Sequence, residues 1–248
     1  MQAILAGHRE ILPQVRTLAE MQAVVFDREW LKKADLQQPL YFMYRDCVLP
    51  EDQETARRLG IRYDITVLLP TRLGCEYNKT KGHYHSEKQR GLAYPELYEV
   101  LEGEGLVLLQ RRDGAAVSDV IALVAQAGDK VIVPPNYGHV TINLGDAPLR
   151  MANWVSLAVE SYYGPYEEKN GAAYWVLAPE RSGGPRRYLP NIRYGRLPQL
   201  RVLSAYEIPE LNLTRQTPIY DLIKRPQFLR FLNYPEEFSD LWQRLYER

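Results

Sequence analysis

Histidine is rare in this chain, and three of its four histidines fall in one pattern. His83 and His85 flank Tyr84, His139 follows about fifty residues later, and Glu96 lies between the two groups. Neutral imidazole is the commonest metal ligand among side chains, and imidazoles combined with a carboxylate suit iron, manganese, nickel or zinc. The pattern therefore predicts a metal site.

Strand geometry explains how this spacing would work. Alternate residues of a strand face the same side, so His83 and His85 are expected to point together, with their imidazoles about 6–7 Å apart. Glu96 and His139 each begin a predicted strand, and strand starts can converge inside a rolled antiparallel sheet. Three nitrogens and one carboxylate oxygen leave one or two coordination positions open, as a catalytic metal site requires.

Taken alone, each of these residues has an ordinary structural explanation that involves no metal. A single histidine at a strand start is more often a hydrogen-bonded core or surface residue than a ligand. Glu87 and Glu99 lie near Glu96 in the sequence, and they are the next candidates if Glu96 is not the carboxylate ligand.

The elements that must position these residues are mostly strands. From residue 61 the chain shows short β-type segments separated by turn residues every 8–12 positions, a pattern typical of a sandwich or barrel. Two turns, at residues 102–105 and 145–148, are expected to close β-hairpins. The predicted strands are residues 61–69, 96–101, 105–110, 117–124, 130–133, 139–144, 149–156 and 173–177.

Two further regions flank these strands, which divides the chain into three parts. Residues 1–58 read as an N-terminal arm with a helix over residues 12–21, a strand over 39–48 and a short helix over 51–59. Residues 59–180 form the predicted barrel, and residues 181–248 form a C-terminal extension. The extension begins with a linker, Ser182-Gly183-Gly184-Pro185-Arg186-Arg187, and ends in a helix opened by Pro235. The apolar stripe of that helix is expected to dock onto the β core or a partner subunit.

Composition excludes some classes of function. Lysine and arginine balance aspartate and glutamate, giving a formal net charge of zero, so nothing predicts binding to nucleic acid. No segment reads as a signal peptide or approaches the roughly 18 apolar residues of a membrane span. Cys47 and Cys75 are too few for a disulfide framework and predict free thiols in a reducing cytoplasm.

The spacing around the histidines resembles the cupin superfamily. In its first motif a His-x-His pair and a glutamate are followed by glycine seven residues later, as Glu96 and Gly103 are here. Its second motif is matched by Gly128, Pro134, His139 and Asn143. One departure is the ten-residue gap between His85 and Glu96, which predicts a loop over residues 86–95 at the barrel mouth. The resemblance implies a mostly β fold, a double-stranded β-helix or jelly-roll barrel.

A closer resemblance is to the cupin-type glucose-6-phosphate isomerases of archaea and some bacteria. It covers roughly residues 20–180, and its most specific part is the run Lys79-Thr80-Lys81-Gly82-His83-Tyr84-His85. The other matching segments are Thr66-Val67-Leu68, Glu96-Leu97-Tyr98, Gly103-Glu104-Gly105, Leu108-Leu109-Gln110, Val133-Pro134-Pro135 and His139 to Asp146.

This resemblance implies a set of substrate contacts. By position, the substrate phosphate would be held by hydroxyls and backbone N–H groups of Thr66, Thr80, Gly82 and Tyr98, and Tyr163 would help close the sugar end. Converging donors suit a phosphate dianion, and a glycine lets a backbone N–H approach closely. Val155 and Ser161 depart from the polar or aromatic sugar-contacting residues that related enzymes carry.

The resemblance also implies the reaction. Glucose 6-phosphate and fructose 6-phosphate would be interconverted with one divalent metal ion per subunit, Fe, Mn, Ni or Zn, held by His83, His85, Glu96 and His139. Glu96 would be both a ligand and a proton shuttle, passing through a cis-enediol, with a hydride shift as the rival mechanism. Family members of this kind are often homodimers that pair by sheet extension.

Two other functions fit a cupin. The chain could act on another small polar substrate as a different sugar isomerase, an epimerase or a dioxygenase, or it could be a non-catalytic sugar-binding cupin. Thr80 and Gly82 beside the first histidine favour a phosphorylated substrate, since a dioxygenase has no need of them. An open coordination position favours an enzyme over a binding protein.

Overall fold

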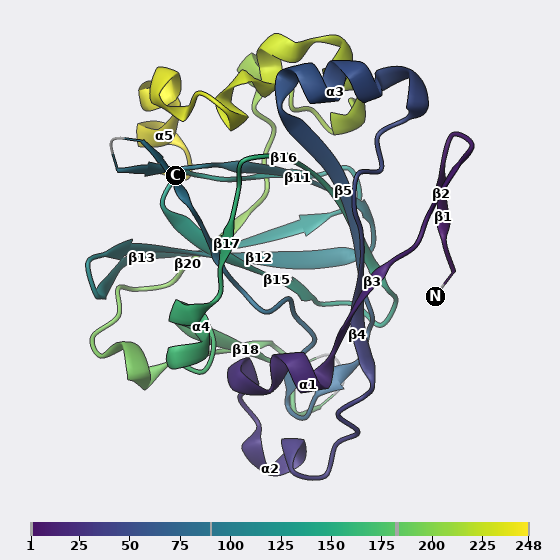
Figure 1. The fold of residues 1–248 in the computed structure, drawn as a ribbon. Helices are drawn as coiled ribbons and strands as arrows, with labels where there is room; N and C mark the ends of the chain where they lie inside the picture. The colour runs from purple at the N-terminus through teal and green to yellow at the C-terminus, as the bar shows by residue number, and fades with distance from the viewer. Residues whose placement is uncertain (1, 90, 182–183, 248) are drawn as a thin grey trace.

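Two β-sheets face each other and enclose the apolar core (Figure 1). The computed structural model describes residues 2–89, 91–181 and 184–247, so Ser182 and Gly183 of the expected linker lie outside the described residues. The larger sheet has the strand order β14-β11-β16-β5-β4-β3, and the smaller has the order β15-β12-β13-β20.

The two sheets contain the longest strands of the chain. The six-stranded sheet consists of β3 (Gln14–Thr17), β4 (Pro39–Tyr44), β5 (Ile61–Leu68), β11 (Glu96–Glu102), β14 (Lys130–Val133) and β16 (Leu149–Ser156). The four-stranded sheet consists of β12 (Glu104–Asp113), β13 (Ala116–Gln126), β15 (Tyr137–Asn143) and β20 (Arg201–Ser204).

Shorter strands and helices surround these sheets. The remaining strands are β1 (Ile4–Ala6), β2 (Arg9–Ile11), β6 (Arg72–Leu73), β7 (Glu76–Tyr77), β8 (Tyr84–His85), β9 (Glu87–Gln89), β10 (Leu92–Ala93), β17 (Ser161–Tyr162), β18 (Tyr174–Leu177) and β19 (Arg187–Pro190). The α-helices are α1 (Leu18–Met21), α2 (Arg28–Leu31), α3 (Gln53–Leu59), α4 (Gly164–Glu168) and α5 (Ser239–Arg244). The 3-10 helices are Gln22–Val24, Pro50–Asp52, Ile192–Tyr194, Pro209–Leu211, Ile219–Lys224, Pro226–Leu232 and Pro235–Phe238.

The chain crosses repeatedly between the two sheets, which is the cupin arrangement. β11, β14 and β16 belong to the larger sheet, whereas β12, β13 and β15 belong to the smaller. The two predicted hairpins are therefore wrong: the turns at residues 102–105 and 145–148 join strands of different sheets. Turn residues look alike in a hairpin and in a crossover, and the pairing partner is decided by packing. Gly103 has φ +88, and an added Cβ would lie 3.1 Å from the Pro148 carbonyl oxygen, so the two crossovers pack together.

The N-terminal residues extend the larger sheet instead of forming the predicted helix. Over residues 14–17 the chain is a strand, and Val15 pairs with Phe42 of β4. A helix starts only at Leu18, because Thr17 and Glu20 form a capping box there. The helical spacing of residues 12–21 was therefore a misleading signal over its first half.

The C-terminal residues pack against the outer face of the larger sheet, at the top of Figure 1. The Trp154 indole donates to the Ile219 carbonyl at 2.8 Å, and the Tyr246 hydroxyl donates to the Ile132 carbonyl at 2.8 Å. The terminal helix is shorter than predicted, since a 3-10 turn (Pro235–Phe238) precedes α5. Trp242 of this helix packs against Phe231 and Phe238 of the preceding 3-10 helices, and Tyr246, just after the helix, bonds to β14. None of the helices in the described part of the chain is long and apolar enough to cross a membrane.

Candidate metal centre and active site

The four predicted ligand side chains converge inside the barrel. One ligand atom from each of His83, His85, Glu96 and His139 lies within 4.8 Å of every other. His83 and His139 are held side by side by paired backbone hydrogen bonds of 3.3 and 3.0 Å, which form an isolated β-bridge. Their imidazole centroids are 4.4 Å apart.

His85 and Glu96 complete the group from β8 and β11. The Nδ1 atom of His85 lies 2.8 Å from the Tyr94 carbonyl oxygen. A carbonyl oxygen only accepts, so Nδ1 carries the proton and Nε2 is left as the lone-pair nitrogen. That Nε2 lies 3.3 Å from Oε2 of Glu96, and Nε2 of His139 lies 3.4 Å from the same oxygen. Three potential ligand atoms thus meet at one point.

The cluster fits a metal ion by its own chemistry. Oε2 of Glu96 and Nδ1 of His139 are buried and have no hydrogen-bond partner in the part of the chain that the structure describes. An unpaired buried polar atom costs about 1–3 kcal/mol, which a bound cation at the Glu96 oxygen would offset. The alternative carboxylates lie elsewhere: Glu87 is exposed and accepts from the Gly91 N–H, and Glu99 pairs with Lys130 at 3.2 Å.

The pKa shifts of His83, His139 and Glu96 favour the protonation states that metal binding requires. Burial, with the neighbouring imidazoles, lowers the pKa of His83 well below its usual range. Burial also lowers the pKa of His139 to about 4, against the opposing effect of Glu96. Burial opposes ionisation of Glu96, yet the adjacent His85 and His139 hold its pKa below the ordinary value. Neutral imidazoles and an ionised carboxylate bind divalent cations near neutral pH.

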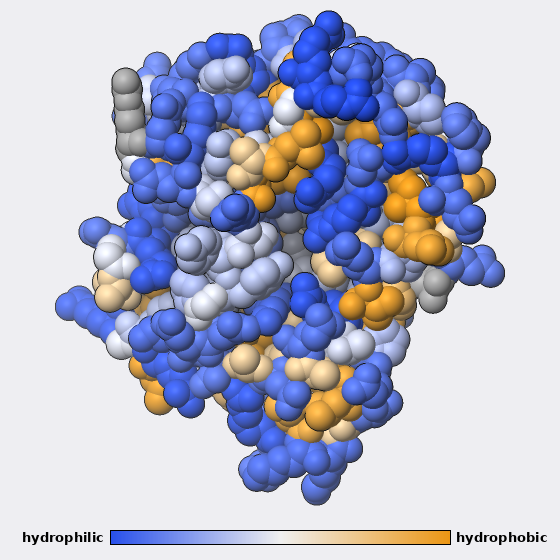
Figure 2. Space-filling view, in the orientation of Figure 1, coloured by the Kyte–Doolittle hydropathy of each residue, from blue (hydrophilic) through white to orange (hydrophobic). Residues whose placement is uncertain are grey.

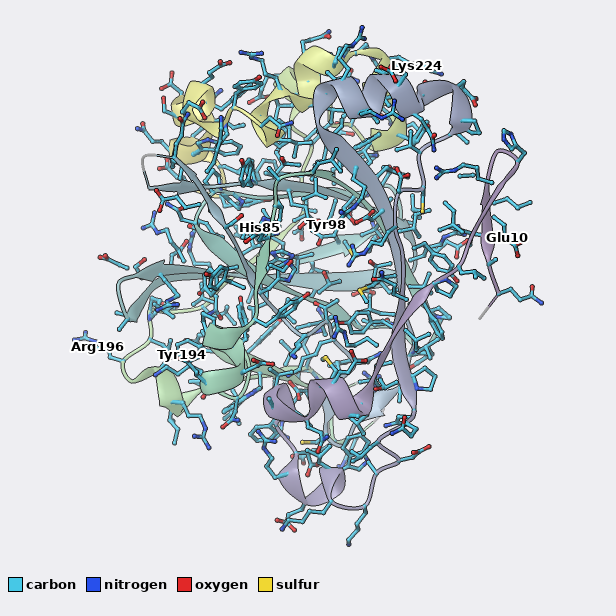
Figure 3. All side chains as sticks on the ribbon, viewed as in Figure 1. Glu10, His85, Tyr98, Tyr194, Arg196 and Lys224 are labelled. Carbon is cyan, nitrogen blue, oxygen red and sulfur yellow. The ribbon has the colours of Figure 1, made fainter. Side chains whose placement is uncertain are left out.

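A cavity of about 90 Å³ adjoins the cluster. Figure 3 labels His85 and Tyr98 near the centre of the barrel, and the space-filling view in Figure 2 is hollowed near the middle of the same face. A larger hollow of about 790 Å³ lies beside β13 and the C-terminal residues. It contains none of the four ligand residues, so the smaller cavity is the candidate active site.

Comparison with known proteins identifies the family. A family model described as glucose-6-phosphate isomerase matches residues 15–193, which is more than half of the chain. This chain belongs to the glucose-6-phosphate isomerase family. It is thus an isomerase that acts on a phosphorylated sugar.

Curated glucose-6-phosphate isomerases of archaea are similar in sequence. The protein from Pyrococcus abyssi is 31% identical over 146 residues, covering 58% of this chain and 69% of that one. The protein from Thermococcus litoralis is 34% identical over 135 residues, covering 54% and 64%. The protein from Thermococcus gammatolerans is 32% identical over 166 residues, covering 67% and 79%. The matches thus span between 64% and 79% of the lengths of these three relatives.

Solved cupin structures are more distant. An oxalate oxidase has a TM-score of 0.31 and 20% identity, covering 42% of this chain and 43% of its own. The oxalate decarboxylase of Bacillus subtilis has a TM-score of 0.37 and 19% identity, covering 53% and 30%. The cupin arrangement of the isomerase-family chain follows from its own sheet topology.

The structure brings four of the five expected substrate contacts to the cavity. Thr66, Thr80, Tyr98 and Tyr163 line it. The Thr66 hydroxyl makes no hydrogen bond within the described residues, and the Thr80 hydroxyl accepts from the Thr141 N–H at 2.9 Å, which leaves its proton available. The Tyr98 hydroxyl lies 3.1 Å from Nε2 of His139.

Gly82 is not part of the cavity lining. It has φ +82, and an added Cβ would lie 2.6 Å from the Tyr166 ring and 2.7 Å from the Val140 side chain. Only glycine fits here, for reasons of packing as well as backbone conformation. Its N–H has no hydrogen-bond partner among the described residues, so it remains available as a donor.

The expected loop before Glu96 is partly ordered as a strand pair. β9 and β10 form a small antiparallel unit, and the Asn136 side chain joins it by accepting from the Ala93 N–H at 2.8 Å and donating to the Gly91 carbonyl. This insert also carries Tyr94, whose carbonyl orients His85. The insert between His85 and Glu96 therefore helps to orient a ligand of the metal centre.

Sequence reasoning missed several polar residues of the cavity wall, namely Arg45, Arg62, Asp64 and Asn153. A signal was present, because Arg62 and Asp64 alternate with apolar residues on β5 at positions that share a face with Thr66. Val155 and Ser161, the two departures from the family pattern, line the same cavity.

Proposed function

We propose that this chain interconverts glucose 6-phosphate and fructose 6-phosphate in the cavity beside its His/Glu cluster. The observation that carries this proposal is the convergence of four metal-ligand atoms next to hydroxyl donors. His83, His85, Glu96 and His139 would hold one divalent ion per subunit. Their mixed nitrogen and oxygen donors suit Fe, Mn, Ni or Zn.

The reaction moves a proton between C1 and C2 of the sugar. When bound, the divalent ion would act as a Lewis acid for the negative charge that develops on the substrate oxygen. Glu96 is the proton carrier in this proposal, because its carboxylate is ionised, buried and aimed into the cavity. A cis-enediol is the expected intermediate. Turnover in D₂O distinguishes the rival hydride shift, which would leave the product without deuterium at carbon.

The phosphate end of the sugar would be bound by neutral donors. The hydroxyls of Thr66, Thr80 and Tyr98 and the N–H of Gly82 are proposed to bind it, and Tyr163 to close the sugar end. The Thr66 hydroxyl and the Gly82 N–H support this role, since neither donor has an acceptor among the described residues. The ring of Tyr163 lies 5.4 Å from that of His83, beside the metal centre.

The three expected parts of the chain have distinct roles in this proposal. Residues 59–180 carry the chemistry, since they supply all cavity-lining residues except Tyr41 and Arg45. In the N-terminal part, β3 and β4 extend the larger sheet. In the C-terminal part, β20 extends the smaller sheet, and the residues from Ile219 onward cover the outer face of the larger one. A cytoplasmic location is proposed as well, supported by the free thiols of Cys47 and Cys75.

A homodimer is the proposed assembly. β3 is the edge strand of the larger sheet, and the β1–β2 hairpin stands away from the body (Figure 1). Leu5 and Leu12 of this region are 73% and 74% exposed. An apolar arm beside an open sheet edge suits pairing with a second copy. Light scattering on wild type and on the double variant Leu5→Glu/Leu12→Glu tests this: a monomeric wild type would refute it.

One assay tests the activity. The purified chain is stripped of metal, reloaded with Fe, Mn, Ni or Zn, and given fructose 6-phosphate, with glucose 6-phosphate detected by a coupled dehydrogenase. Turnover is expected with at least one metal and none after chelation. Absence of turnover with all four metals would refute the isomerase proposal.

A further inference from the structure

The insert between His85 and Glu96 closes on itself at its base. The Tyr94 N–H donates to the Ser86 carbonyl at 3.3 Å, so the two ends of the insert meet beside His85. Between these ends lies the β9–β10 pair, of three and two residues, whose register is irregular. A hairpin of this size is marginally stable in water by itself. The conformation of the insert therefore depends on contacts with other parts of the chain.

Glu236 of the C-terminal extension makes such contacts. It belongs to the 3-10 turn Pro235–Phe238, which lies beside β10. Its two carboxylate oxygens accept from Nζ of Lys88 at 2.8 and 3.0 Å, and Oε1 also accepts from Nε2 of Gln89 at 2.6 Å. Nζ of Lys88 lies 4.6 Å from the centroid of the Tyr234 ring. The extension thus holds the outer strand of the insert at two successive residues.

The Lys88–Glu236 pair is better placed than an ordinary surface ion pair. The side chains of Lys88 and Glu236 are only 17% and 24% exposed. An exposed pair contributes about 0–1 kcal/mol, whereas partial burial and bonds to both carboxylate oxygens strengthen the attraction. The contact can therefore bias the conformation of a small hairpin.

The extension is itself fixed to the barrel next to this contact. The Asn233 side chain accepts from the Ser156 hydroxyl at 2.6 Å and donates to the Leu59 carbonyl at 2.8 Å. Phe231 is fully buried, and the Trp242 indole donates to the Pro235 carbonyl at 2.7 Å. Glu236 therefore stands on a rigid support.

The other end of this series of contacts is a ligand of the metal centre. Nδ1 of His85 lies 2.8 Å from the Tyr94 carbonyl, which fixes the proton on Nδ1 and directs Nε2 toward Glu96. The group that bonds to the second nitrogen of a ligating histidine sets the orientation and basicity of its ring. A shift of the insert would move this carbonyl and, with it, the imidazole.

The insert and the extension are also the segments in which the chain departs from the family pattern. The insert lengthens the gap between two ligands of the first motif, and the family match ends at Arg193, before most of the extension. These two segments lie about 150 residues apart in the sequence, yet their side chains bond to each other, as Lys88 and Glu236 do with a separation of 148. The extension thus supports a loop that the rest of the barrel leaves weakly held.

We propose that Glu236 is a positioning residue for the metal centre: through Lys88 it holds the insert, and the insert holds the Tyr94 carbonyl on His85. The C-terminal extension then sets the affinity of the site for its metal ion. This inference rests on the proposed function for the metal at His85, but not for the identity of the sugar.

The first test is made on the metal-free protein. Glu236→Ala should speed hydrogen exchange at the Ala93 and Tyr94 amides about tenfold, since bonds to a charged group that holds the hairpin are lost. The matched control is Glu237→Ala, because Glu237 lies in the same turn but pairs with Arg230 inside the extension. It should leave these rates within about twofold. Unchanged rates in Glu236→Ala, or equal acceleration in both variants, would overturn the inference.

The second test measures the metal centre itself. By calorimetry, Glu236→Ala should weaken Mn²⁺ binding roughly three- to tenfold, less than the loss of about 10–100-fold that follows removal of a direct partner of a ligand. Glu237→Ala should bind Mn²⁺ as the wild type does. The absorption spectrum of bound Co²⁺, which reports the arrangement of ligands around the ion, should change in Glu236→Ala alone. Unchanged Mn²⁺ affinity or an unchanged Co²⁺ spectrum in Glu236→Ala would overturn the link to His85.

Lys88→Ala removes the same contact from the other side and leaves the extension intact. It should reproduce both effects, and Lys88→Ala/Glu236→Ala should be no weaker than the single variants, since the two residues act through one contact. Additive losses in the double variant would overturn the inference. If Glu236→Ala fails to fold by thermal melting, Lys88→Ala decides: unchanged exchange and unchanged Mn²⁺ binding in it overturn the inference.

The outcomes for this inference and for the proposed function are distinct. Wild-type turnover of fructose 6-phosphate, together with insert exchange that ignores Glu236, would refute the inference alone. A wild type that binds Mn²⁺ more tightly than Glu236→Ala, but has no isomerase activity with any metal, would refute the proposed function and support the inference.

Discussion

The hydroxyl of Tyr98 lies 3.1 Å from Nε2 of His139, the nitrogen that also faces Glu96 at 3.4 Å. Burial raises the pKa of Tyr98 well above its ordinary value, so the phenol remains a hydrogen-bond donor. A lone pair that accepts from Tyr98 is not available to a metal ion. Binding of an ion at Nε2 would therefore release the Tyr98 hydroxyl toward the cavity.

Replacing Tyr98 with phenylalanine should separate metal binding from substrate binding. Tyr98→Phe removes the competing hydrogen bond, worth about 0.5–1.5 kcal/mol, so metal affinity should rise roughly two- to tenfold. The same variant should raise KM for fructose 6-phosphate, because a phosphate donor is lost. Calorimetry with Mn²⁺ or Zn²⁺ and steady-state kinetics measure the two effects.

Tyr41→Phe, on the same cavity wall but without a bond to His139, is the control for metal affinity. Weaker metal binding in Tyr98→Phe alone would contradict this account.

Glu96→Gln should leave the fold intact and reduce turnover by orders of magnitude. The amide keeps the shape of the carboxylate but can neither carry the proton nor supply a negative ligand atom. Turnover and metal content are measured together, so that loss of metal is distinguished from loss of proton transfer. Glu87→Gln is the matched control, because Glu87 is exposed and should not affect either quantity. Activity near that of the wild type in Glu96→Gln would assign the proton transfer to another group.

The spacing of the candidate site could be read from the sequence because strand periodicity is regular. His83 and His85 are two residues apart on an extended segment, and the two motifs fix Glu96 and His139 relative to their turns. Arg62 and Asn153 could not be placed in the same way. Their role depends on which strands become neighbours across the sheet, and that pairing is decided by packing of the whole barrel.

The dependence of strand pairing on packing also explains the wrong predictions for the two turns and for residues 14–17. The residues 102–105 and 145–148 have good turn chemistry, but such turns serve equally to reverse a strand or to send it to the opposite sheet. Residues 14–17 carry helical spacing, and tertiary pairing of Val15 with Phe42 overrides it. Most strand positions were still predictable, since alternation and turn residues are local signals.

The stability of the metal-free protein should fall on acidification. The folded pKa of His139 is about 4, whereas an imidazole in the unfolded chain titrates near 6.5. Between these values the unfolded chain binds more protons, so the free energy of unfolding decreases as the pH falls from about 6.5 toward 4. Each such imidazole contributes a slope approaching about 1.4 kcal/mol per pH unit.

Urea unfolding between pH 4.5 and 7 measures this effect. His139→Gln should show a shallower dependence on pH than the wild type, because it removes one group that must be buried without charge. His8→Gln is the control, since His8 is exposed on the turn between β1 and β2 and should leave the slope unchanged. Identical slopes in all three proteins would show that burial does not lower the pKa of His139 in the folded state.

The two thiols should differ strongly in reactivity. Cys47 is buried between β4 and α3, and burial, with the nearby Asp64 carboxylate, raises its pKa to about 12. Cys75 is exposed. The thiolate is the reactive form, so iodoacetamide at pH 8 should modify Cys75 in the native protein and Cys47 only after unfolding.

Mass spectrometry of wild type and Cys75→Ser checks this, since the variant should take up no label until denaturant is added. Rapid native labelling of Cys47 would mean that the segment joining β4 to α3 opens, and with it the adjoining Arg45–Asp64 wall of the cavity.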